Sequence, residues 1–271
     1  MEISNNEIDE LAERILEKYS TCIPVDPLEI ASNNNIEVIA GSYGQFFKGL
    51  IKYSNGNFFI FLNLDKLDNP KFTIARYTFS HELGHYFIGT HRKKLKSGES
   101  IAFTGKDSKD PEKKVIEDQA QQFAASLLMP KTHYTIFFNQ LNKIGFSAIL
   151  DLKIYFNVSI ISAAIRFISL NLTPCITILW KENGIINKGV SQKFIELVDG
   201  RNVEIKLNPD RPKLEETTIT HKESGIKYFR SITPLSSWSY NLPKDFSNEF
   251  FLTEDTFYCN NWNLTILYPV F

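Results

Sequence analysis

Apolar residues recur at helical spacing in several parts of the chain. Ser4, with Glu7 three residues later, forms a capping box, and the apolar positions behind it predict a helix over residues 5–19. Asp26-Pro27 has the composition of an N-cap and a first helical position, which predicts a short second helix over residues 27–31. Further helical patterns cover residues 72–88, 112–129, 146–154 and 159–170.

β-rich runs predict strands in the first part of the chain. Residues 36–39 form one such run, and residues 49–53 and 58–62 form two more on either side of Ser54-Asn55-Gly56-Asn57. Asn-Gly between two β-rich runs is a strong hairpin signal, so we expect an antiparallel pair there. We also expect residues 57–62 to form an edge strand on which an extended peptide can add.

The pattern changes along the chain and predicts an α+β protein with three parts. Residues 1–135 mix helices with a small antiparallel or mixed sheet, and residues 136–172 hold a helical pair whose short connection, 155–158, is similar to a helix-turn-helix. Residues 173–271 read as a β-rich domain. Its strands are expected at residues 175–180, 184–190, 203–207 and 264–270.

Residues 92–111 are charged, rich in Ser and Gly, and mostly without periodicity, which predicts a loop. The segment is either a plain solvated connection or a loop that gates a substrate. In the β-rich domain, aromatic residues either line a ligand surface or form an ordinary core. These residues include Trp180, Trp238, Tyr240, Trp262 and Tyr268.

Charge and cysteine content exclude several classes of protein. The 30 basic and 31 acidic residues nearly balance, so no overall field draws the chain to nucleic acid or to an anionic membrane. The helical pair offers only Arg166 as an obvious DNA contact, so direct nucleic-acid binding is not expected. Three widely separated cysteines do not fit a disulfide framework, and no run approaches the ~18 apolar residues of a membrane span. We therefore expect a cytoplasmic protein.

The segment His81-Glu82-Leu83-Gly84-His85 carries the candidate chemistry. Two histidines four residues apart on a helix lie on one face, so both imidazoles can bind one cation at ~2.0–2.1 Å. Glu82 is placed to take a proton from water that the metal activates. This pattern indicates a metallopeptidase that uses Zn²⁺, with Mn²⁺ or another divalent ion as the alternative.

Catalytic zinc usually has three protein ligands, and two residues compete for the third place. Glu117 opens an otherwise apolar stripe of the next predicted helix, where small Ala120 and Ala124 permit close approach. His91 follows the motif, but the pattern that uses such a histidine needs glycine at position 88, where this chain has Ile88. Glu117 is favoured, and His91 stays the alternative.

Residues around this site have open roles. Gln121 either accepts a hydrogen bond from a ligating histidine or is exposed. His133, Tyr86 and Tyr53 are alternative stabilisers of an oxyanion, with no spacing that selects among them. His221 lies in a charged stretch and is expected to be exposed.

Four segments together resemble the ImmA/IrrE-type metallopeptidases. They are IPVDPLEIASNNNIEVI (23–39), FTIARYTFSHELGHYFIG (72–89), EDQAQQFAASLLMP (117–130) and FNVSIISAAIRF (156–167). The resemblance covers roughly residues 7–170 and implies a zincin-like domain over residues 1–135. It implies that His81, His85 and Glu117 bind zinc and that Glu82 is the general base. Gln121 departs from the family, which usually has Asn or Asp there.

The resemblance also implies a function. Such a protein would be an endopeptidase that cleaves a DNA-binding transcriptional repressor and so switches on stress-response or mobile-element genes. The β-rich part would then be a sensor or substrate-binding domain. A different class of function is a regulatory binding protein in which the metal site is structural or vestigial.

Overall fold

The structure, a computed structural model, describes most of the chain. The described residues are 3–19, 22–67, 72–98, 110–181, 183–198, 218–239, 250–259 and 261–270. They form helices and two separate sheets, which confirms the predicted α+β class. The chain divides into two compact units, one of residues 1–134 with 155–159 and the other of residues 135–154 with 160–271. The domain boundaries at residues 135 and 172 remain a prediction.

The first two helices begin where the sequence places their caps. Helix α1 (Asn5–Tyr19) follows the capping box, in which the Ser4 backbone N–H and hydroxyl donate to the Glu7 carboxylate at 2.8 and 2.7 Å. Helix α2 (Pro27–Asn33) follows Asp26, whose carboxylate accepts a hydrogen bond from the Leu28 backbone N–H at 2.9 Å. These local bonds satisfy N–H groups that a helix start leaves without an intrahelical partner.

The sheet of the first unit has three strands in the order β1-β3-β2. Strands β2 (Gly49–Ser54) and β3 (Asn57–Asn63) form the predicted hairpin, and β1 (Glu37–Gly41) pairs in parallel with the other side of β3. The expectation that residues 57–62 form an edge strand is therefore wrong. The long-range pairing with β1 makes β3 central and leaves β2 as an edge.

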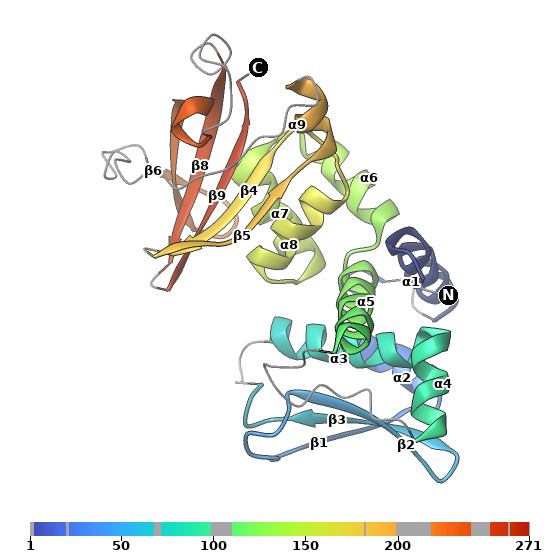
Figure 1. Cartoon of the computed structure of the whole chain (residues 1–271). Helices are drawn as coiled ribbons and strands as arrows, with labels where there is room; N and C mark the ends of the chain where they lie inside the picture. The colour runs from blue at the N-terminus through green and yellow to red at the C-terminus, as the bar shows by residue number, and fades with distance from the viewer. Residues whose placement is uncertain are drawn as a thin grey trace. The chain divides into compact units, whose positions relative to one another are not determined.

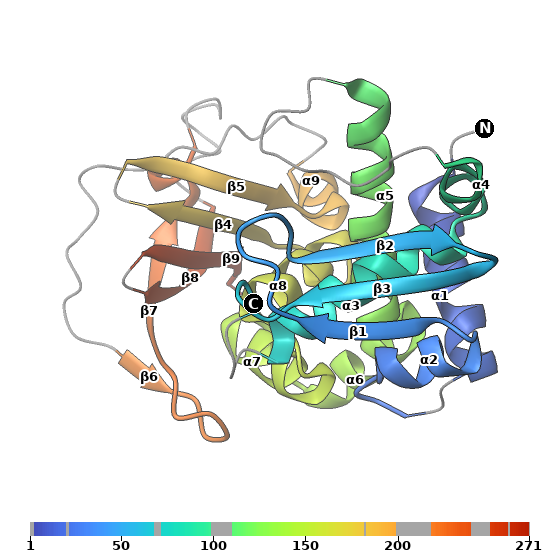
Figure 2. The ribbon, with the colours of Figure 1, turned by 90° about the horizontal axis from the view of Figure 1, so that it is seen from below.

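Helices cover one face of this sheet (Figures 1 and 2). They include α3 (Phe72–Phe87) and α4 (Gly89–Ser97), and α5 (Pro111–Leu128) packs against α3 and α1. Helix α4 contradicts the loop expected over residues 92–111, because His91 and Leu95 bury one side of an otherwise charged helix. Residues 99–109 of that expected loop lie outside the described residues.

Helices α3 and α5 pack closely because small residues face each other. A Cβ added at Gly84 would lie 3.2 Å from the Ala120 Cα and 3.1 Å from the Phe123 ring. Ala120 and Ala124 are fully buried, as the sequence indicated. Gly84, inside the segment His81–His85, thus has a packing role, since it lets the backbone of α5 lie against α3.

Three helices follow α5. Helix α6 (Lys131–Leu141) had no counterpart among the predicted helices, whereas α7 (Gly145–Phe156) and α8 (Ile160–Ser169) match the predicted pair. The connection between α7 and α8 belongs to the first unit, where Arg76 donates to the carbonyls of Phe156, at 3.2 Å, and Asn157. Arg166 is buried, so it does not offer the DNA contact considered from the sequence.

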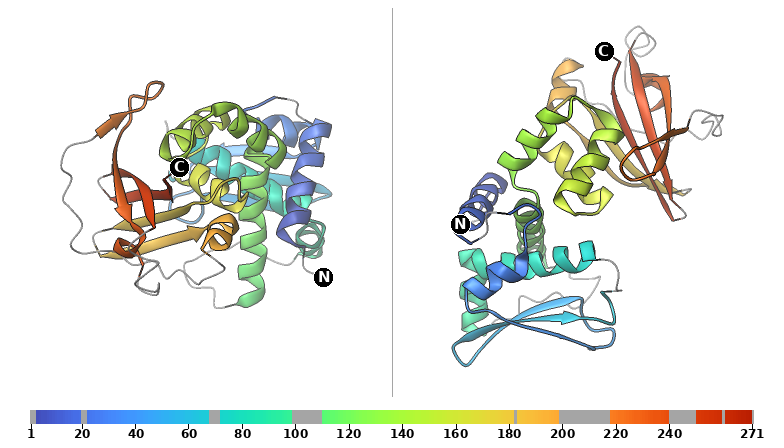
Figure 3. Two further views of the ribbon diagram at one scale, coloured as in Figure 1. Left: turned by 90° about the horizontal axis from the view of Figure 1, so that it is seen from above. Right: turned by 180° about the vertical axis from the view of Figure 1, so that it is seen from behind.

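The second unit contains a six-stranded antiparallel sheet in the order β5-β4-β9-β8-β7-β6 (Figure 3). Its strands are β4 (Ile176–Lys181), β5 (Gly184–Val190), β6 (Thr218–Thr220), β7 (Lys227–Pro234), β8 (Phe251–Cys259) and β9 (Trp262–Pro269). A short helix, α9 (Gln192–Leu197), follows β5. The strand expected at 203–207 and Tyr240 lie outside the described residues. Trp238 and Tyr268 are buried core residues of this unit.

Buried charges join the sheet of the second unit to α7. Asp255 is fully buried and accepts hydrogen bonds from the Arg230 guanidinium at 2.6 and 2.9 Å, from the Phe146 backbone N–H at 2.9 Å and from the Tyr268 hydroxyl at 3.1 Å. His221, expected to be exposed, is buried beside the carboxylate of Asp151 on α7, with Nε2 and Oδ1 3.0 Å apart.

No single helix in the described ranges is long and apolar enough to cross a membrane. Helices α7 and α8 together reach the required length and composition, and the chain bends by 110° between them.

Substitution of Gly145 tests the buried Asp255 network. Gly145 has a φ of 69°, and a Cβ there would lie 2.3 Å from the Tyr268 ring and 2.6 Å from Asp255 Oδ2. We expect Gly145→Ala to cost about 1 kcal/mol for the left-handed backbone and about 1–3 kcal/mol more for overpacking. Urea unfolding followed by tryptophan fluorescence measures this loss, because all three tryptophans lie in the second unit.

Gly225→Ala is the matched control for that measurement. Gly225 has a φ of 65° in the same unit, and a Cβ there would meet nothing within 4 Å. It should therefore cost only the backbone term. Equal losses in the two variants would show that the packing around Asp255 does not constrain this turn.

Candidate metal centre

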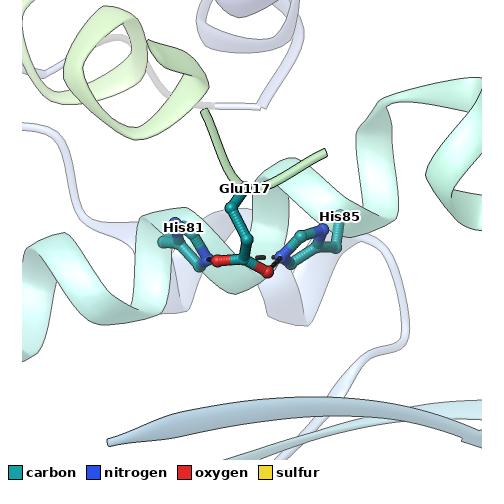
Figure 4. A group of neighbouring side chains, drawn as sticks. All are labelled: His81, His85 and Glu117. Atoms are coloured by element: carbon teal, nitrogen blue, oxygen red, sulfur yellow. Dashed lines mark hydrogen bonds and ion pairs between the residues drawn. The ribbon is translucent and has the colours of Figure 1, made fainter. Parts of the chain in front are cut away.

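Three side chains from two helices converge in the first unit (Figure 4). His81 and His85 lie one turn apart on α3, and Glu117 faces them from α5. The two histidine Nε2 atoms are 3.2 Å apart. Glu117 Oε2 lies 3.2 Å from His81 Nε2, and Oε1 lies 3.5 Å from His85 Nε2. The structure thus brings together the three residues that the sequence proposed as ligands.

These separations fit a tetrahedral metal ion. Ligand atoms at ~2.0–2.1 Å from a zinc ion with tetrahedral angles lie ~3.3–3.4 Å from one another. The two histidine Nε2 atoms, 3.2 Å apart, are close to this spacing, and each lies within 3.5 Å of a different oxygen of Glu117, so the carboxylate can supply the third donor. Two imidazoles and one carboxylate are a donor set of catalytic zinc sites, in which the fourth position takes water or substrate.

The three groups also shift one another's charge states. Burial alone raises the pKa of Glu117, but its contacts with the rings of His81 and His85 outweigh burial and lower the pKa to about 2. Burial lowers the pKa of His81, yet the hydrogen bond with Glu117 and the charge of Glu82 outweigh it, so the net change is a raised pKa. The carboxylate of Glu117 therefore stays ionised at neutral pH and attracts a cation.

Glu82 lies beside this group, against the edge strand β2. Its side chain is buried, and burial raises the pKa of its carboxyl group. The Ile51 backbone N–H donates a hydrogen bond to the carboxylate. A Cβ at Gly49 would lie 2.8 Å from Glu82 Oε1 and 2.6 Å from the Thr78 methyl group. Glycine at position 49 therefore leaves room for Glu82 to reach the strand.

A cleft of 410 Å³ opens over these residues. Its polar lining includes His81, Glu82, His85, Glu117 and Gln121, and its apolar lining includes Phe47, Leu50, Ile51, Ile74 and Tyr77. A pocket with convergent polar groups on one side and apolar walls elsewhere is typical of a substrate site.

His91 does not join the three convergent donors. It is buried on α4, where its Nδ1 lies 3.3 Å from Nδ1 of His85, the nitrogen that faces away from Glu117. Its Nε2 lies 2.9 Å from the Gln119 side-chain oxygen. Burial and the neighbouring His85 lower the pKa of His91 to about 4, so the ring is neutral at pH 7. The sequence did not single out Gln119.

The other residues considered from the sequence lie in different places. Gln121 lines the cleft, and its backbone carbonyl accepts from the Tyr77 hydroxyl at 3.3 Å. Tyr53 and Tyr86 pack against Phe58 away from the lining of the cleft, and His133 is exposed on α6.

Among the described residues, Tyr77 is the tyrosine that lines the cleft, although the sequence reasoning gave it no role in the site. It lies one helical turn before His81, so the four-residue spacing along α3 is a signal that could have identified it. Burial raises the pKa of Tyr77 to about 12, so its hydroxyl keeps its proton and acts as a donor at neutral pH.

The chain is similar to known proteins in sequence and in fold. The family model described as the IrrE N-terminal-like domain, a peptidase family, matches residues 32–167. A solved structure titled as a Mycobacterium tuberculosis transcriptional regulator is similar, with a TM-score of 0.62 and 13% sequence identity, over 98% of this chain and 77% of that chain. At this identity the likeness shows the fold alone. No curated protein matches the chain by sequence.

Removal of a ligand tests the metal centre directly. We expect His81→Ala, His85→Ala and Glu117→Ala each to weaken zinc binding by at least about 100-fold, because each removes one of three protein donors. Competition with a chromophoric chelator measures the affinity. His133→Ala removes an exposed histidine of the same unit and should leave the affinity unchanged. Wild-type affinity in the three ligand variants would exclude this site.

The raised pKa of His81 makes zinc binding sensitive to pH. A metal ion and a proton compete for the same imidazole nitrogen. The pKa of His81 lies above the ordinary value of 6.5, so the ring keeps its proton to a higher pH. As the pH is lowered, the affinity for zinc should therefore begin to fall while the pH is still above 6.5, and it should fall further toward pH 5.5. Calorimetry in buffers of different ionisation enthalpy should detect proton release on binding near pH 7. Affinity that stays constant down to pH 5.5 would contradict this expectation.

Proposed function

Because the chain belongs to the peptidase family of the IrrE N-terminal-like domain, we propose that it is a zinc-dependent endopeptidase of the ImmA/IrrE type. The observation that carries the proposal is the convergence of His81, His85 and Glu117 beside Glu82 in one cleft. The substrate class is a DNA-binding transcriptional repressor in the cytoplasm, whose cleavage switches on stress-response or mobile-element genes. The substrate assignment follows from the family resemblance.

The residues of the cleft divide the hydrolytic work. A divalent ion held by His81, His85 and Glu117 would supply Lewis acidity, which would polarise the scissile carbonyl and make water acidic enough to lose a proton near pH 7. Glu82 accepts that proton and passes it to the leaving amine. Burial raises the pKa of Glu82, so the carboxylate is a stronger base than an exposed one and its acid form can donate the proton. His81, His85 and Glu117 hold the ion.

The edge strand β2 is the surface on which an extended substrate can lie. Residues 47–51, which lead into β2 and include its first three residues, line the cleft, and one side of this strand has no partner strand in the described sheet. Addition of a peptide to such an edge uses backbone hydrogen bonds, which are independent of sequence. Selectivity then depends on the apolar walls of Phe47, Leu50 and Ile74 and on surfaces outside the cleft.

A second candidate is a regulatory binding protein whose metal site is structural. The observation that favours it is the size and separate compactness of the second unit. In this alternative the second unit captures a partner and the ion only stabilises the first unit.

Glu82→Gln discriminates between the two functions. The change removes the base but no metal donor, so we expect wild-type zinc affinity and loss of cleavage by a factor of at least about 100, in the range of general-base catalysis. The assay is the appearance of fragments of a repressor encoded by a neighbouring gene and produced together with each variant. Unchanged biological switching by Glu82→Gln would favour the binding protein.

Gly49→Ala tests the position of Glu82 against β2. The added methyl group must displace the Glu82 carboxylate or the Thr78 side chain, so cleavage should fall by about tenfold or more, equivalent to about 1.4 kcal/mol. Zinc affinity should not change. Gly89→Ala is the control in the same unit, since a Cβ there meets nothing within 4 Å. Equal cleavage by both variants would show that this contact does not position the base.

A further inference from the structure

A chain of hydrogen bonds runs from His85 to the start of α1. His85 Nδ1 lies 3.3 Å from His91 Nδ1, and His91 Nε2 lies 2.9 Å from Gln119 Oε1. Gln119 Nε2 in turn donates to the backbone carbonyl of Ile3 at 3.2 Å. Four separate elements thus contribute to one continuous path: α3, α4, α5 and the residue before the α1 capping box.

The carbonyl of Ile3 fixes the direction of every bond in this path. A backbone carbonyl only accepts, so the amide nitrogen of Gln119 must face Ile3 and its oxygen must face His91. Because that oxygen only accepts, His91 must carry its proton on Nε2. In a neutral imidazole the other nitrogen, Nδ1, is then a bare acceptor.

The same logic continues to His85. The bare Nδ1 of His91 needs a donor, and His85 Nδ1 is the atom that faces it. With a proton on Nδ1, a neutral His85 has a bare Nε2. This is the nitrogen that lies 3.2 Å from His81 Nε2 and 3.5 Å from Glu117 Oε1.

We propose that His91 and Gln119 are positioning residues that hold a proton at Nδ1 of His85 and thereby keep its Nε2 free to bind the metal. The metal requires the same assignment from the other end, since a histidine nitrogen binds a cation only when it carries no proton. Hydrogen bonds to ligating histidines more often come from carboxylates, backbone carbonyls or water, and here a second imidazole takes that place.

Packing around the hydrogen-bonded path holds its residues in position. His91 is 1% exposed, so water does not compete for its nitrogens. The Ile3 carbonyl precedes Ser4, whose backbone N–H and hydroxyl are tied to Glu7. Helix α1 is further joined to α5 by hydrogen bonds from Gln122 and Ser126 to Asp9. The position of the accepting carbonyl is therefore set by several contacts that do not involve the metal site.

The inference rests on the ligand role of His85 in the proposed function, and its test reads the tautomer of His85 in the metal-free protein. The chain has five histidines, so ¹⁵N-histidine labelling gives few side-chain signals to assign. In the wild type we expect the Nδ1–H form of His85 and the Nε2–H form of His91. Gln119→Leu and His91→Phe should move His85 toward the Nε2–H form and weaken zinc binding by about tenfold.

Two further variants separate this role from packing. Gln119→Glu keeps an oxygen that accepts from His91 but loses the bond to the Ile3 carbonyl, so the His91 and His85 tautomers should be retained, whereas a role through the contact with Ile3 would not be rescued by this change. Asp118→Asn changes the exposed neighbouring residue and should have no effect. Circular dichroism of each metal-free variant reports whether the fold is kept.

The outcomes distinguish this inference from the proposed function. An unchanged His85 tautomer and wild-type zinc affinity in both Gln119→Leu and His91→Phe would overturn the role of the path. If the wild type binds zinc without cleaving any repressor, the proposed function fails but the path stands. If the wild type binds no zinc, the ligand role of His85 fails and the inference falls with it, whatever the tautomers are.

Discussion

The contact between α3 and α5 is the constraint on which the candidate site depends. The two histidines occupy one helix and the carboxylate occupies the other, so their separation is set by how closely the backbones approach. Gly84 and Ala120 allow that approach, and any larger side chain at either position would separate the donors. Donor distances near 3.3 Å tolerate little movement, because metal–ligand bonds vary by only about 0.2 Å.

Close packing of α3 and α5 also gathers ionisable side chains in a buried site, where an unpaired charge is costly. Glu82, His85 and His91 are buried, and His81 and Glu117 are mostly so. Without a cation the histidines and Glu117 compensate one another, which explains the opposite shifts in the pKa values of His81 and Glu117. A divalent ion replaces a shared proton with a stronger and fixed positive charge. The burial that makes unpaired charge costly at this site would thus favour the binding of a metal ion.

The sequence identified the parts of this site that follow from local spacing. The histidine pair and its glutamate lie within one helical turn or so, and Glu117 is marked as a charge at the head of an apolar stripe. The place of β3 in the sheet was predicted wrongly, because the pairing with β1 depends on residues about twenty positions away. Helix α4 was missed because only two buried positions interrupt its charged surface. Gln119 gave no signal, since its partners lie 28 and 116 residues away.

The path from Ile3 to His85 also bears on the order in which the molecule is assembled. Its contacts join the first residues of the chain to a helix that ends near residue 128, so they can form only after both segments have folded against each other. Closure of such long loops is entropically expensive and therefore late. A nascent or partly folded chain contains the histidines, but the Ile3 carbonyl is not yet in place to fix which nitrogen of each ring carries the proton. On the proposed role of the path, full affinity for a metal ion would therefore require the completed unit.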